Sequence, residues 1–436
     1  GLMHSALGSA AAAAVSSAAA ALCTCFAGSL VQVRRKQSKE AESETLVPKQ
    51  SELRTSFFDR LGRPQYILSP MVDQSELPFR LLARRYGAQL CYTPMVNAGQ
   101  FVRSSSYRQE ILESMPMEDR PLIVQFAGHE PATLLQAGRY VQHLCDAVDL
   151  NLGCPQHIAR RGRYGAFLLE EEDLVVEIVR TLSHNLTVPV TCKIRLFRND
   201  LPRTLRLCHR LEEAGCALLT VHGRTRYQNK QTVGSCDFNA IATIKAALRI
   251  PVIANGGIAL FGDVQRCLAN TGVDGVMSSE AALENPALFC CNRDTDGNYV
   301  DQNRLAREYL DLAEHYLPDS KGNKAACPSC VKAHLFKFLH AGLQANPDLR
   351  STVSEGQTLH DFRTVFEELA ARGWEQPLFH HPDYSQDQSW YYRHRLSKQG
   401  KAEGADASEK GAPSSGAEEA EAEDVPWCAM IFDEVA

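Results

Sequence analysis

Residues 147–155 read AVDLNLGCP, an apolar run that predicts a buried strand and then a turn that holds Cys154 between Gly153 and Pro155. A cysteine fixed on a turn just beyond a strand lies where proteins place an acid or a nucleophile at the edge of a site. The alternative is that Cys154 is a small core residue, as most unpaired cysteines are. The rest of the chain has to distinguish these two interpretations.

The run at residues 147–151 is one of eight short, β-rich apolar segments that alternate with longer amphipathic segments between residues 66 and 277. Eight repeats of strand and helix predict a parallel (β/α)8 barrel. A doubly wound sheet is the competing architecture, and the count of eight favours the barrel. The predicted strands are Tyr66–Ser69, Gln89–Thr93, Leu122–Phe126, Ala147–Asn151, Val190–Ile194, Leu218–His222, Val252–Asn255 and Gly275–Met277. The predicted helices are Leu77–Tyr86, Ala132–Leu144, Asp173–Ser183, Leu201–Ala214, Phe238–Ala247 and Gly262–Asn270.

The chain of 436 residues exceeds what one hydrophobic core usually supports, so we expect more than one domain. After residue 286 the alternation stops, and helical patterns over Arg304–Tyr316, Cys330–Ala341 and Leu359–Ala371 predict a small helical domain. The predicted organisation is an Ala-rich, disordered extension at 1–60, the barrel at 64–295, the helical domain at 300–373, and an irregular segment with an acidic disordered tail at 374–436.

Charge is distributed unevenly along the chain. Residues 401–436 contain ten Asp and Glu against two Lys, so this tail carries a net charge of −8 and is predicted to be solvated and disordered. The whole chain carries −6, so the residues before 401 sum to +2. This mildly basic body is compatible with a nucleic-acid partner.

Fifteen cysteines, an odd number, are scattered through the predicted core elements, which is typical of reduced thiols in an intracellular protein. Cys327 and Cys330 resemble half of a zinc site, but His334 and His340 fall on different faces of the predicted helix, so we expect no metal. We also expect no transmembrane span. The expected protein is a cytoplasmic monomer, with a nuclear location or organellar targeting by the Ala-rich start left open.

Unusual polar residues and glycines follow strand after strand. Taken singly, His222 could be a structural histidine, Lys193 a solvated strand end, and Gly256-Gly257 a turn that requires positive φ. Because the carboxyl ends of barrel strands form one rim, their convergence favours a site. The residues concerned are Pro70, Met71, Val72, Gln125, Asn151, Cys154, Lys193, Arg195, His222, Arg224, Asn255, Gly256, Gly257, Ser279 and Glu280.

The last two strand ends and the barrel mouth predict a cofactor. Glycines after the seventh strand and small residues after the eighth are where barrels bind phosphate through backbone N–H groups. Lys193 and Gln125 are predicted to project into the mouth, where a cation near N1 and the C2 carbonyl of a flavin stabilises its reduced form. Together these features predict FMN, with its phosphate by the seventh and eighth strands and its ring over the barrel axis.

The order of the motifs Pro-Met, Gln, Asn-x-Gly-Cys-Pro, Lys-Ile-Arg, Val-His-Gly-Arg and Asn-Gly resembles that of the tRNA-dihydrouridine synthases. The longer stretches MVDQSELPF (71–79), DLNLGCP (149–155) and LTVHGRT (219–225) are similar in detail to the eukaryotic branch that acts on tRNA positions 16 and 17. The resemblance covers residues 64–345, and such a set of motifs in order is highly specific.

The resemblance implies FMN-dependent reduction of the C5=C6 bond of uridine in the tRNA D-loop, with NADPH or NADH as reductant and Cys154 as proton donor. An ordinary thiol, with a pKa of about 8.5, is mostly protonated at neutral pH and suits that role. The implied flavin-site residues are Pro70, Met71, Val72, Gln125, Lys193, His222, Asn255, Gly256, Gly257, Ser279 and Glu280. Candidates for binding the uracil edge are Asn151, Arg195 and Arg224.

The target base has to be flipped out of the D-loop to reach a flavin, so basic residues should surround the barrel mouth. The candidates for phosphate contacts are Arg160, Arg161, Arg163, Lys324, Lys332 and Lys337. One departure concerns Ser279-Glu280, where many family members carry Gly-Arg. Backbone amides would then hold the flavin phosphate, with Arg226 as a source of positive charge.

Two other functions compete with this interpretation. An FMN barrel oxidoreductase acting on a small molecule would share the flavin but need no helical tRNA-binding domain. A non-catalytic tRNA-binding protein could keep the fold, although the intact Cys154, Lys193 and His222 argue against it. Flavin absorbance of the purified protein would separate the second alternative from an enzyme.

Overall fold

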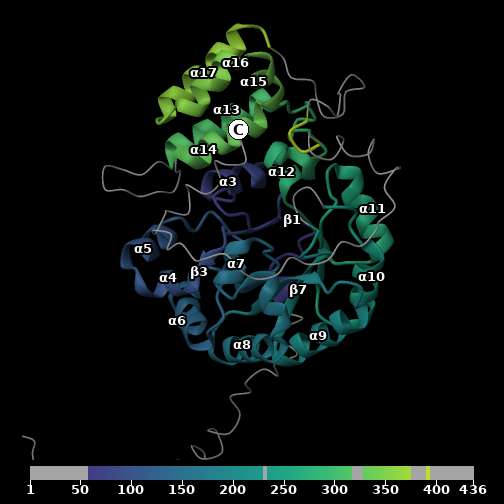
Figure 1. The fold of residues 1–436 in the computed structure, drawn as a ribbon. Coiled ribbons are helices and arrows are strands. Elements are labelled where there is room, and N and C mark those ends of the chain that lie inside the picture. Colours follow the sequence, from purple (N-terminus) through teal and green to yellow (C-terminus); the bar gives the residue numbers. More distant parts are fainter. Residues whose placement is uncertain (1–56, 229–232, 317–327, 375–388, 393–436) are drawn as a thin grey trace, which may run out of the picture. The chain divides into compact units, whose positions relative to one another are not determined.

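The structure is a computed structural model that describes residues 57–228, 233–316, 328–374 and 389–392 (Figure 1). All of these residues belong to one compact unit that begins at residue 54. The predicted disordered extension and the acidic tail lie outside the described residues. No helix among the residues that the structure describes is long and apolar enough to cross a membrane.

Parallel strands close into a barrel, which confirms the predicted fold and excludes the doubly wound sheet. Neighbouring strands pair in the order β2-β1-β9-β8-β7-β6-β5-β4, and β2 pairs with β4 to close the ring. The short strand β3 pairs with the carboxyl end of β4. The strands are β1 (Tyr66–Leu68), β2 (Leu90–Tyr92), β3 (Val96–Asn97), β4 (Leu122–Ala127), β5 (Ala147–Leu152), β6 (Val190–Leu196), β7 (Cys216–Thr225), β8 (Val252–Asn255) and β9 (Gly275–Ser278). Each of the eight predicted strands is present.

Helices surround the barrel, as Figure 1 shows, and their ends follow local capping chemistry. In the helix Leu201–Ala214, the side chain of Asp200 accepts the N–H of Arg203, Pro202 lies in the first turn, and Gly215 ends the helix at φ +111°. The barrel helices are α3 (Leu77–Arg85), α4 (Ala98–Arg103), α5 (Ser105–Glu113), α6 (Pro131–Val141), α7 (His157–Arg161), α8 (Glu172–Asn185), α9 (Leu201–Ala214), α10 (Phe238–Ala247), α11 (Phe261–Thr271) and α12 (Glu280–Glu284). The described residues also form the 3₁₀ helices η1 (Gly165–Glu170) and η3 (Pro286–Cys290).

The barrel interior changes character from one end to the other. Its amino-terminal layer is apolar and includes Ile123, Leu218 and Ile253, with Phe57 and Phe58 in the same cluster. Because side chains alternate along a strand, residues two positions further along point inward again. At those positions the interior becomes polar, with Gln125 two residues after Ile123 and Asn255 two residues after Ile253.

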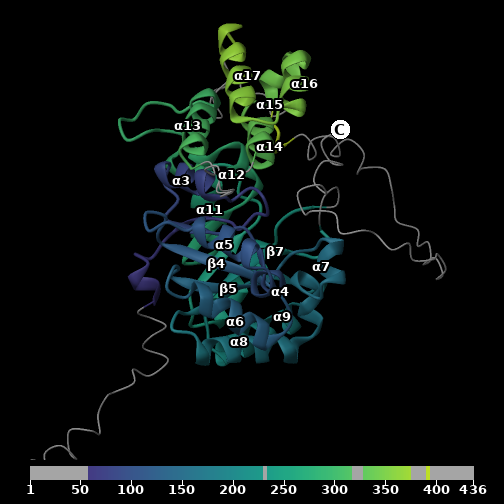
Figure 2. The same ribbon diagram turned by 90° about the vertical axis from the view of Figure 1, so that its left-hand side faces the viewer.

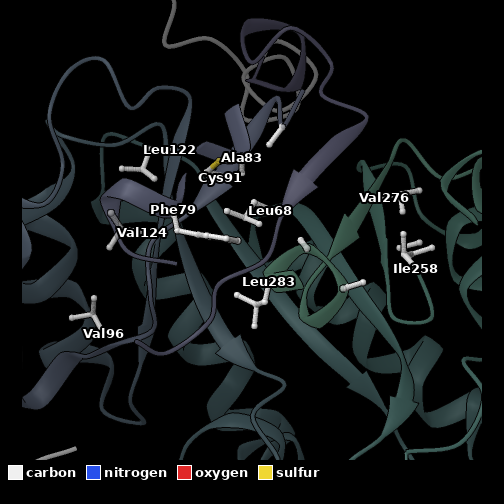
Figure 3. Packing of buried hydrophobic residues seen from close by; sticks show 14 of the residues in the cluster. Leu68, Phe79, Ala83, Cys91, Val96, Leu122, Val124, Ile258, Val276 and Leu283 are labelled. Carbon is white, nitrogen blue, oxygen red and sulfur yellow. The ribbon is translucent and has the colours of Figure 1, made fainter. Parts of the chain in front are cut away.

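A second, larger core lies between the strands and the helices. Leu68, Phe79, Cys91 and Val124 belong to it, and Figure 3 shows them packed together. Leu68 thus faces outward from β1, while its neighbour Ile67 belongs to the interior cluster. The two cores together fix the rotation of each strand about its own axis.

Five helices follow the barrel in the described part of the chain, and Figure 2 shows them gathered beyond α3 and α12. They are α13 (Gln302–His315), α14 (Pro328–Phe338), α15 (His340–Ala345), α16 (Pro347–Glu355) and α17 (Leu359–Ala371). The boundary between barrel and helical domain stays a prediction, since all of these elements lie in one compact unit.

A buried carboxylate joins the barrel to these helices. Glu76 precedes α3; it accepts a hydrogen bond from Tyr309 Oη at 2.6 Å and contacts His334 Nε2 at 3.1 Å. Phe79 stacks on the same imidazole, with 4.4 Å between ring centroids. Burial lowers the pKa of His334, with Glu76 opposing the shift, so the neutral ring donates its Nε2–H to the carboxylate.

A short aromatic segment, residues 389–392, is held by α12 of the barrel and by α14. The buried Glu284 of α12 accepts hydrogen bonds from Ser389 Oγ at 2.7 Å, Trp390 N at 2.9 Å and Tyr391 N at 3.0 Å. Lys337 of α14 lies over the Trp390 ring at 5.0 Å. The sequence pattern had not assigned residues 374–400 to any element, and these four described residues anchor to the end of the barrel.

We expect Glu76→Ala to lower the free energy of unfolding by about 2–4 kcal/mol, because it leaves Tyr309 and His334 buried without their acceptor. Urea unfolding followed by tyrosine and tryptophan fluorescence measures the change. The matched control is Glu118→Ala, which removes an exposed acceptor of Tyr316 and should change stability by no more than about 0.5 kcal/mol. Equal effects of the two substitutions would contradict the conclusion that Glu76 joins the barrel to the helices that follow it.

Candidate active site

Cys154 lies on the loop after β5, and hydrogen bonds fix that loop from two sides. The side-chain oxygen of Asn151 accepts the backbone N–H groups of Gly153 at 3.1 Å and Cys154 at 3.0 Å. On the other side, the N–H of Ala166 donates to the Cys154 carbonyl at 2.9 Å. Cys154 is half-buried and packs against the edge of a small apolar cluster rather than inside a core, which argues against the core-residue interpretation.

Gly165 holds the Cys154 loop by close approach of its backbone. It adopts φ +65°, and a Cβ there would lie 2.5 Å from the Cys154 carbonyl oxygen and 2.9 Å from the Cys154 Cβ. Only glycine fits this position without moving the loop. The sequence reasoning missed Gly165, whose only signal is one more glycine eleven residues beyond the cysteine.

The environment of the Cys154 thiol favours its protonated form. Burial raises the pKa of Cys154, while Arg195 and Lys193 act in the opposite direction. A raised pKa keeps the proton on sulfur at neutral pH, which suits an acid better than a nucleophile.

Polar side chains from β4, β5 and β6 form one buried network next to this loop. Asn151 Nδ2 donates to Gln125 Oε1 at 2.7 Å, and Gln125 Nε2 donates to Asp149 Oδ2 at 2.8 Å. Thr191 Oγ1 donates to the other Asp149 oxygen at 2.6 Å. Asp149 and Thr191 were not among the predicted site residues, although the parallel pairing of β5 with β6 sets them side by side.

Positive charge collects at the ends of β6 and β7. Lys193 Nζ donates to Asn255 Oδ1 at 2.8 Å, and Asn255 Nδ2 donates in turn to the Met277 carbonyl at 3.0 Å and to Ser279 Oγ at 3.2 Å. Burial, reinforced by Arg195, lowers the pKa of Lys193 to about 8. The ends of three strands, β6, β8 and β9, therefore meet through one lysine and one asparagine.

Arg195 donates hydrogen bonds to backbone carbonyls of the rim. Its Nε donates to the Gly153 carbonyl at 2.8 Å, and one terminal nitrogen donates to the Thr225 carbonyl at 2.8 Å and the Gln228 carbonyl at 3.2 Å. Burial, together with Arg224, lowers its pKa to about 10, so the guanidinium stays charged at neutral pH. Arg195 thus ties the Cys154 loop to the end of β7, and a direct contact with substrate stays a prediction.

His222 is neutral because of where it lies. Burial lowers its pKa well below the usual value, and the cations Arg195, Lys193 and Arg224 add to this effect. A terminal nitrogen of Arg224 lies 3.2 Å from His222 Nε2, so the imidazole accepts there.

Two glycines follow β8, and the first of them lies against that histidine. Gly256 adopts φ +103°, and a Cβ on it would lie 2.7 Å from His222 Cδ2. Gly257 follows at φ +72°. Two consecutive glycines with positive φ form a turn without side chains at the rim, and backbone N–H groups in such turns are a known means of binding phosphate.

The remaining predicted flavin-site residues lie at the ends of β1 and β9. The Met71 N–H donates to Ser75 Oγ at 3.0 Å, and Val72 packs in the small apolar cluster that also holds Cys154. Pro70 precedes them and is partly buried. Ser279 is the residue before α12, and Glu280, its first residue, is exposed.

The predicted RNA-contacting residues separate into two groups. Arg160 and Arg161 of α7 are exposed immediately after the Cys154 loop and form no ion pair within the residues that the structure describes. Lys332 and Lys337 are buried and donate to backbone carbonyls at 2.6 and 2.7 Å, so their predicted phosphate contacts lack support. Lys324 lies outside the described residues.

Two further arginines of the rim are already paired. Arg163 pairs with Glu171 at 2.6 Å, and Arg226 pairs with Glu170 at 3.0 Å. Arg226 is therefore a weaker candidate for the flavin phosphate than the sequence suggested. As for a metal, no group of three His, Cys, Asp or Glu among the described residues is arranged to hold one, and Cys327 lies outside them.

Comparison with known proteins identifies the family. The model of the family described as dihydrouridine synthase matches residues 67–372. This chain belongs to the dihydrouridine synthase family. A rat protein named tRNA-dihydrouridine(16/17) synthase NAD(P)(+)-like is 48% identical to this chain over 314 residues. The match covers 72% of this chain and 68% of the rat protein.

Yeast relatives give the same picture. The fission yeast Schizosaccharomyces pombe has a protein named tRNA-dihydrouridine(16/17) synthase that is 41% identical over 312 residues, 71% of this chain and 77% of its own length. The protein of that name from Saccharomyces cerevisiae is 43% identical over 303 residues, 68% of this chain and 70% of its own length. The predicted family and enzyme class are confirmed: the chain is an NAD(P)H-using, flavin-dependent oxidoreductase of uridine in tRNA.

The rim residues fit FMN. The Gly256-Gly257 turn presents backbone without side chains, a Cβ on Gly256 would collide with His222, and Lys193 supplies a partly buried amine. These two features meet the needs of a phosphate and of a reduced flavin ring, respectively. The family assignment and the fit together support the predicted cofactors, FMN with NADPH or NADH.

We expect Gly165→Ala to lower the turnover rate of uridine reduction by at least about tenfold, because the added Cβ pushes the Cys154 loop aside and small misplacements of a reacting group are costly. Gly272→Ala is the matched control: Gly272 has φ +64° but open space around its Cβ position. It carries the same backbone strain without the collision. Dihydrouridine formed in tRNA is the measurement, and equal activity of both variants would contradict the loop constraint.

Proposed function

We propose that this enzyme reduces uridine to 5,6-dihydrouridine at positions 16 and 17 of the tRNA D-loop, and that Cys154 donates the proton to C5. The observation that carries the proposal is a protonated, half-buried thiol held on a fixed loop at the rim that also carries Lys193 and the Gly256-Gly257 turn. The names of the rat and yeast relatives support the two positions.

The reaction adds one hydride and one proton across the C5=C6 bond. Reduced FMN, when bound, supplies the hydride for C6, and NADPH or NADH restores its reduced form. Negative charge then develops at C5 and O4 of the ring, and the S–H bond of Cys154 breaks as its proton passes to C5. Arg195 and Lys193 favour the thiolate left behind, and the half-buried Cys154 then regains a proton from water.

Asn151 is suited to bind the uracil edge. One hydrogen of its amide nitrogen is committed to Gln125, and the same nitrogen lies 3.1 Å from Met95 Sδ. A thioether sulfur is a weak acceptor, so a carbonyl oxygen of uracil would be the better partner for that second hydrogen. Arg195 and Arg224 stay candidates for the same edge.

Lys193 and His222 differ in charge, and we expect them to have different roles at the flavin site. Lys193 is mostly protonated below its pKa of about 8 and is the cation that favours a reduced ring. The neutral His222 adds no charge to a rim that already holds three cations. The other proposed flavin contacts are Pro70, Met71, Val72, Gln125, Asn255, Gly256, Gly257, Ser279 and Glu280.

The RNA is proposed to approach across α7. Arg160 and Arg161 are exposed close to the Cys154 loop, where the phosphates that flank a flipped base would lie. Such contacts position the RNA without reading its sequence. The monomeric state and the cytoplasmic location remain predictions.

We expect Cys154→Ala to lower the rate of uridine reduction by about 10² to 10⁴-fold, the usual contribution of a positioned general acid. FMN content, read from visible absorbance, and tRNA affinity should stay unchanged, because the substitution leaves Lys193, the glycine turn and the exposed arginines of α7 in place. Mapping dihydrouridine in tRNA incubated with each protein measures the effect. If the alanine variant modifies tRNA at the wild-type rate, Cys154 is not the proton donor.

We expect the double substitution Arg160→Glu, Arg161→Glu to weaken tRNA binding and to reduce the slope of log K against log salt by about 2, one unit for each lost phosphate contact. The control is Arg139→Glu with Arg180→Glu, on the exposed surfaces of α6 and α8 near the opposite end of the barrel. Filter binding at several salt concentrations gives both slopes. Loss of affinity in both double variants alike would remove α7 as the docking site.

A further inference from the structure

We propose that Asp149 is a positioning residue for the reaction, which sets the Cys154 loop through a one-directional chain of hydrogen bonds, Asp149 to Gln125 to Asn151 to the backbone of Gly153 and Cys154. The inference rests on the proposed function of Cys154 and Asn151. Asp149 is a buried acid to which neither the sequence motifs nor the proposed reaction assigns a role.

The two ends of this chain fix the direction of every bond in it. At one end, the ionised carboxylate of Asp149 can only accept, so Gln125 must present its NH₂ group there. Gln125 then has only its oxygen left for Asn151, and Asn151 must present its own NH₂ group in turn. The Asn151 oxygen is therefore left to face the loop.

At the other end, the backbone can only donate. The N–H groups of Gly153 and Cys154 both require an acceptor, and the Asn151 oxygen satisfies both at 3.1 and 3.0 Å. The two ends demand the same orientation of the two amides. Reversing either amide would set donor against donor at the loop or acceptor against acceptor inside the chain.

Asp149 is well placed to impose this direction. It is fully buried in the middle of β5, and Thr191 Oγ1 holds its second oxygen at 2.6 Å, so the carboxylate is oriented. Burial raises its pKa to about 6, with hydrogen bonds from Thr191 and Gln125 and the charge of Lys193 opposing the shift. The group is thus an anion at neutral pH.

The orientation matters for both reacting partners. It places the Asn151 oxygen under the Cys154 loop, and it leaves the Asn151 amide nitrogen free to donate its second hydrogen at the rim, now toward Met95 Sδ. One buried carboxylate therefore sets both the position of the acid and the polarity of the group proposed to bind uracil.

Reversing the chain tests the inference. Asn151→Asp alone puts carboxylates at both ends of Gln125, which has a single NH₂ group and cannot serve both. Adding Asp149→Asn gives a chain that runs the opposite way: the introduced amide donates to the Gln125 oxygen, Gln125 donates to the introduced carboxylate, and that carboxylate still accepts from the loop. The double variant should therefore restore the loop but not uracil binding.

The readout is the rate at which iodoacetamide alkylates Cys154 in the flavin-bound enzyme, followed by mass spectrometry of its peptide. We expect Asn151→Asp to change this rate by at least about threefold, within the range of couplings in one hydrogen-bond network, and the double variant to return to within about twofold of wild type. Uridine reduction should stay low in both. An additive double variant, or no change in Asn151→Asp, overturns the proposal.

Two further variants keep the test decisive. Gln125→Met, which retains length but cannot donate and accepts only weakly, must alter the alkylation rate if it folds, and an unchanged rate also overturns the proposal. Asp146→Asn makes the Asp-to-Asn change just before the other end of β5, where the carboxylate accepts from Leu122 N, and should leave the rate unchanged. Because alkylation needs no turnover, full activity of Cys154→Ala would refute the proton donor without affecting this result.

Discussion

The two-residue period of a strand in a closed barrel is the constraint on which the site depends. Closure through the β2–β4 pairing leaves each strand one inward face, and the apolar layer around Ile123 and Ile253 fixes which face that is. Every second residue beyond that layer then points to the barrel axis. Gln125, Asn255 and the other rim residues converge because of this register rather than because of contacts with one another.

The convergence of these side chains buries positive charge at the rim. Lys193, Arg195 and Arg224 lie around His222, and burial, reinforced by repulsion between the cations, lowers the pKa values of Lys193, Arg195 and His222. Burying cations is costly unless hydrogen bonds replace the lost water. Here they do: Lys193 donates to Asn255, and Arg195 donates to three backbone carbonyls. The same bonds that offset the desolvation also tie the loops of β5, β7 and β8 into one rigid rim.

The sequence predicted the parts of the molecule that repeat. The eight strands were found because their apolar runs recur at regular spacing, and the rim residues followed from their places at the strand ends. The short elements α4, α5, α7 and α16 were missed, because they lack an amphipathic period long enough to recognise, although Asn97 and Ser104 cap α4 and α5 with residues typical of helix starts.

What the sequence could not predict were relations between strands. The motif containing Asp149 marks it as part of a strand, but its partners Gln125 and Thr191 become visible only when the register is known. Gly165 is similar, since its closeness to the Cys154 carbonyl depends on how η1 folds back over the loop. Likewise, Lys332 and Lys337 look like surface lysines in sequence, and only the packing of α14 shows that they are buried.

An acid in this chemistry has to satisfy opposite demands before and after it reacts. Before the proton moves, the thiol must hold it, and burial of Cys154 achieves this by disfavouring the thiolate. Afterwards the thiolate must be stable enough to form, and the positive charges of Arg195 and Lys193 lower its energy. Because Arg195 also donates to the carbonyl of Gly153, directly before the cysteine, the cation that stabilises the thiolate is bonded to the loop that carries it. Arg195 therefore contributes both to the position of the Cys154 loop and to the electrostatics of its thiol.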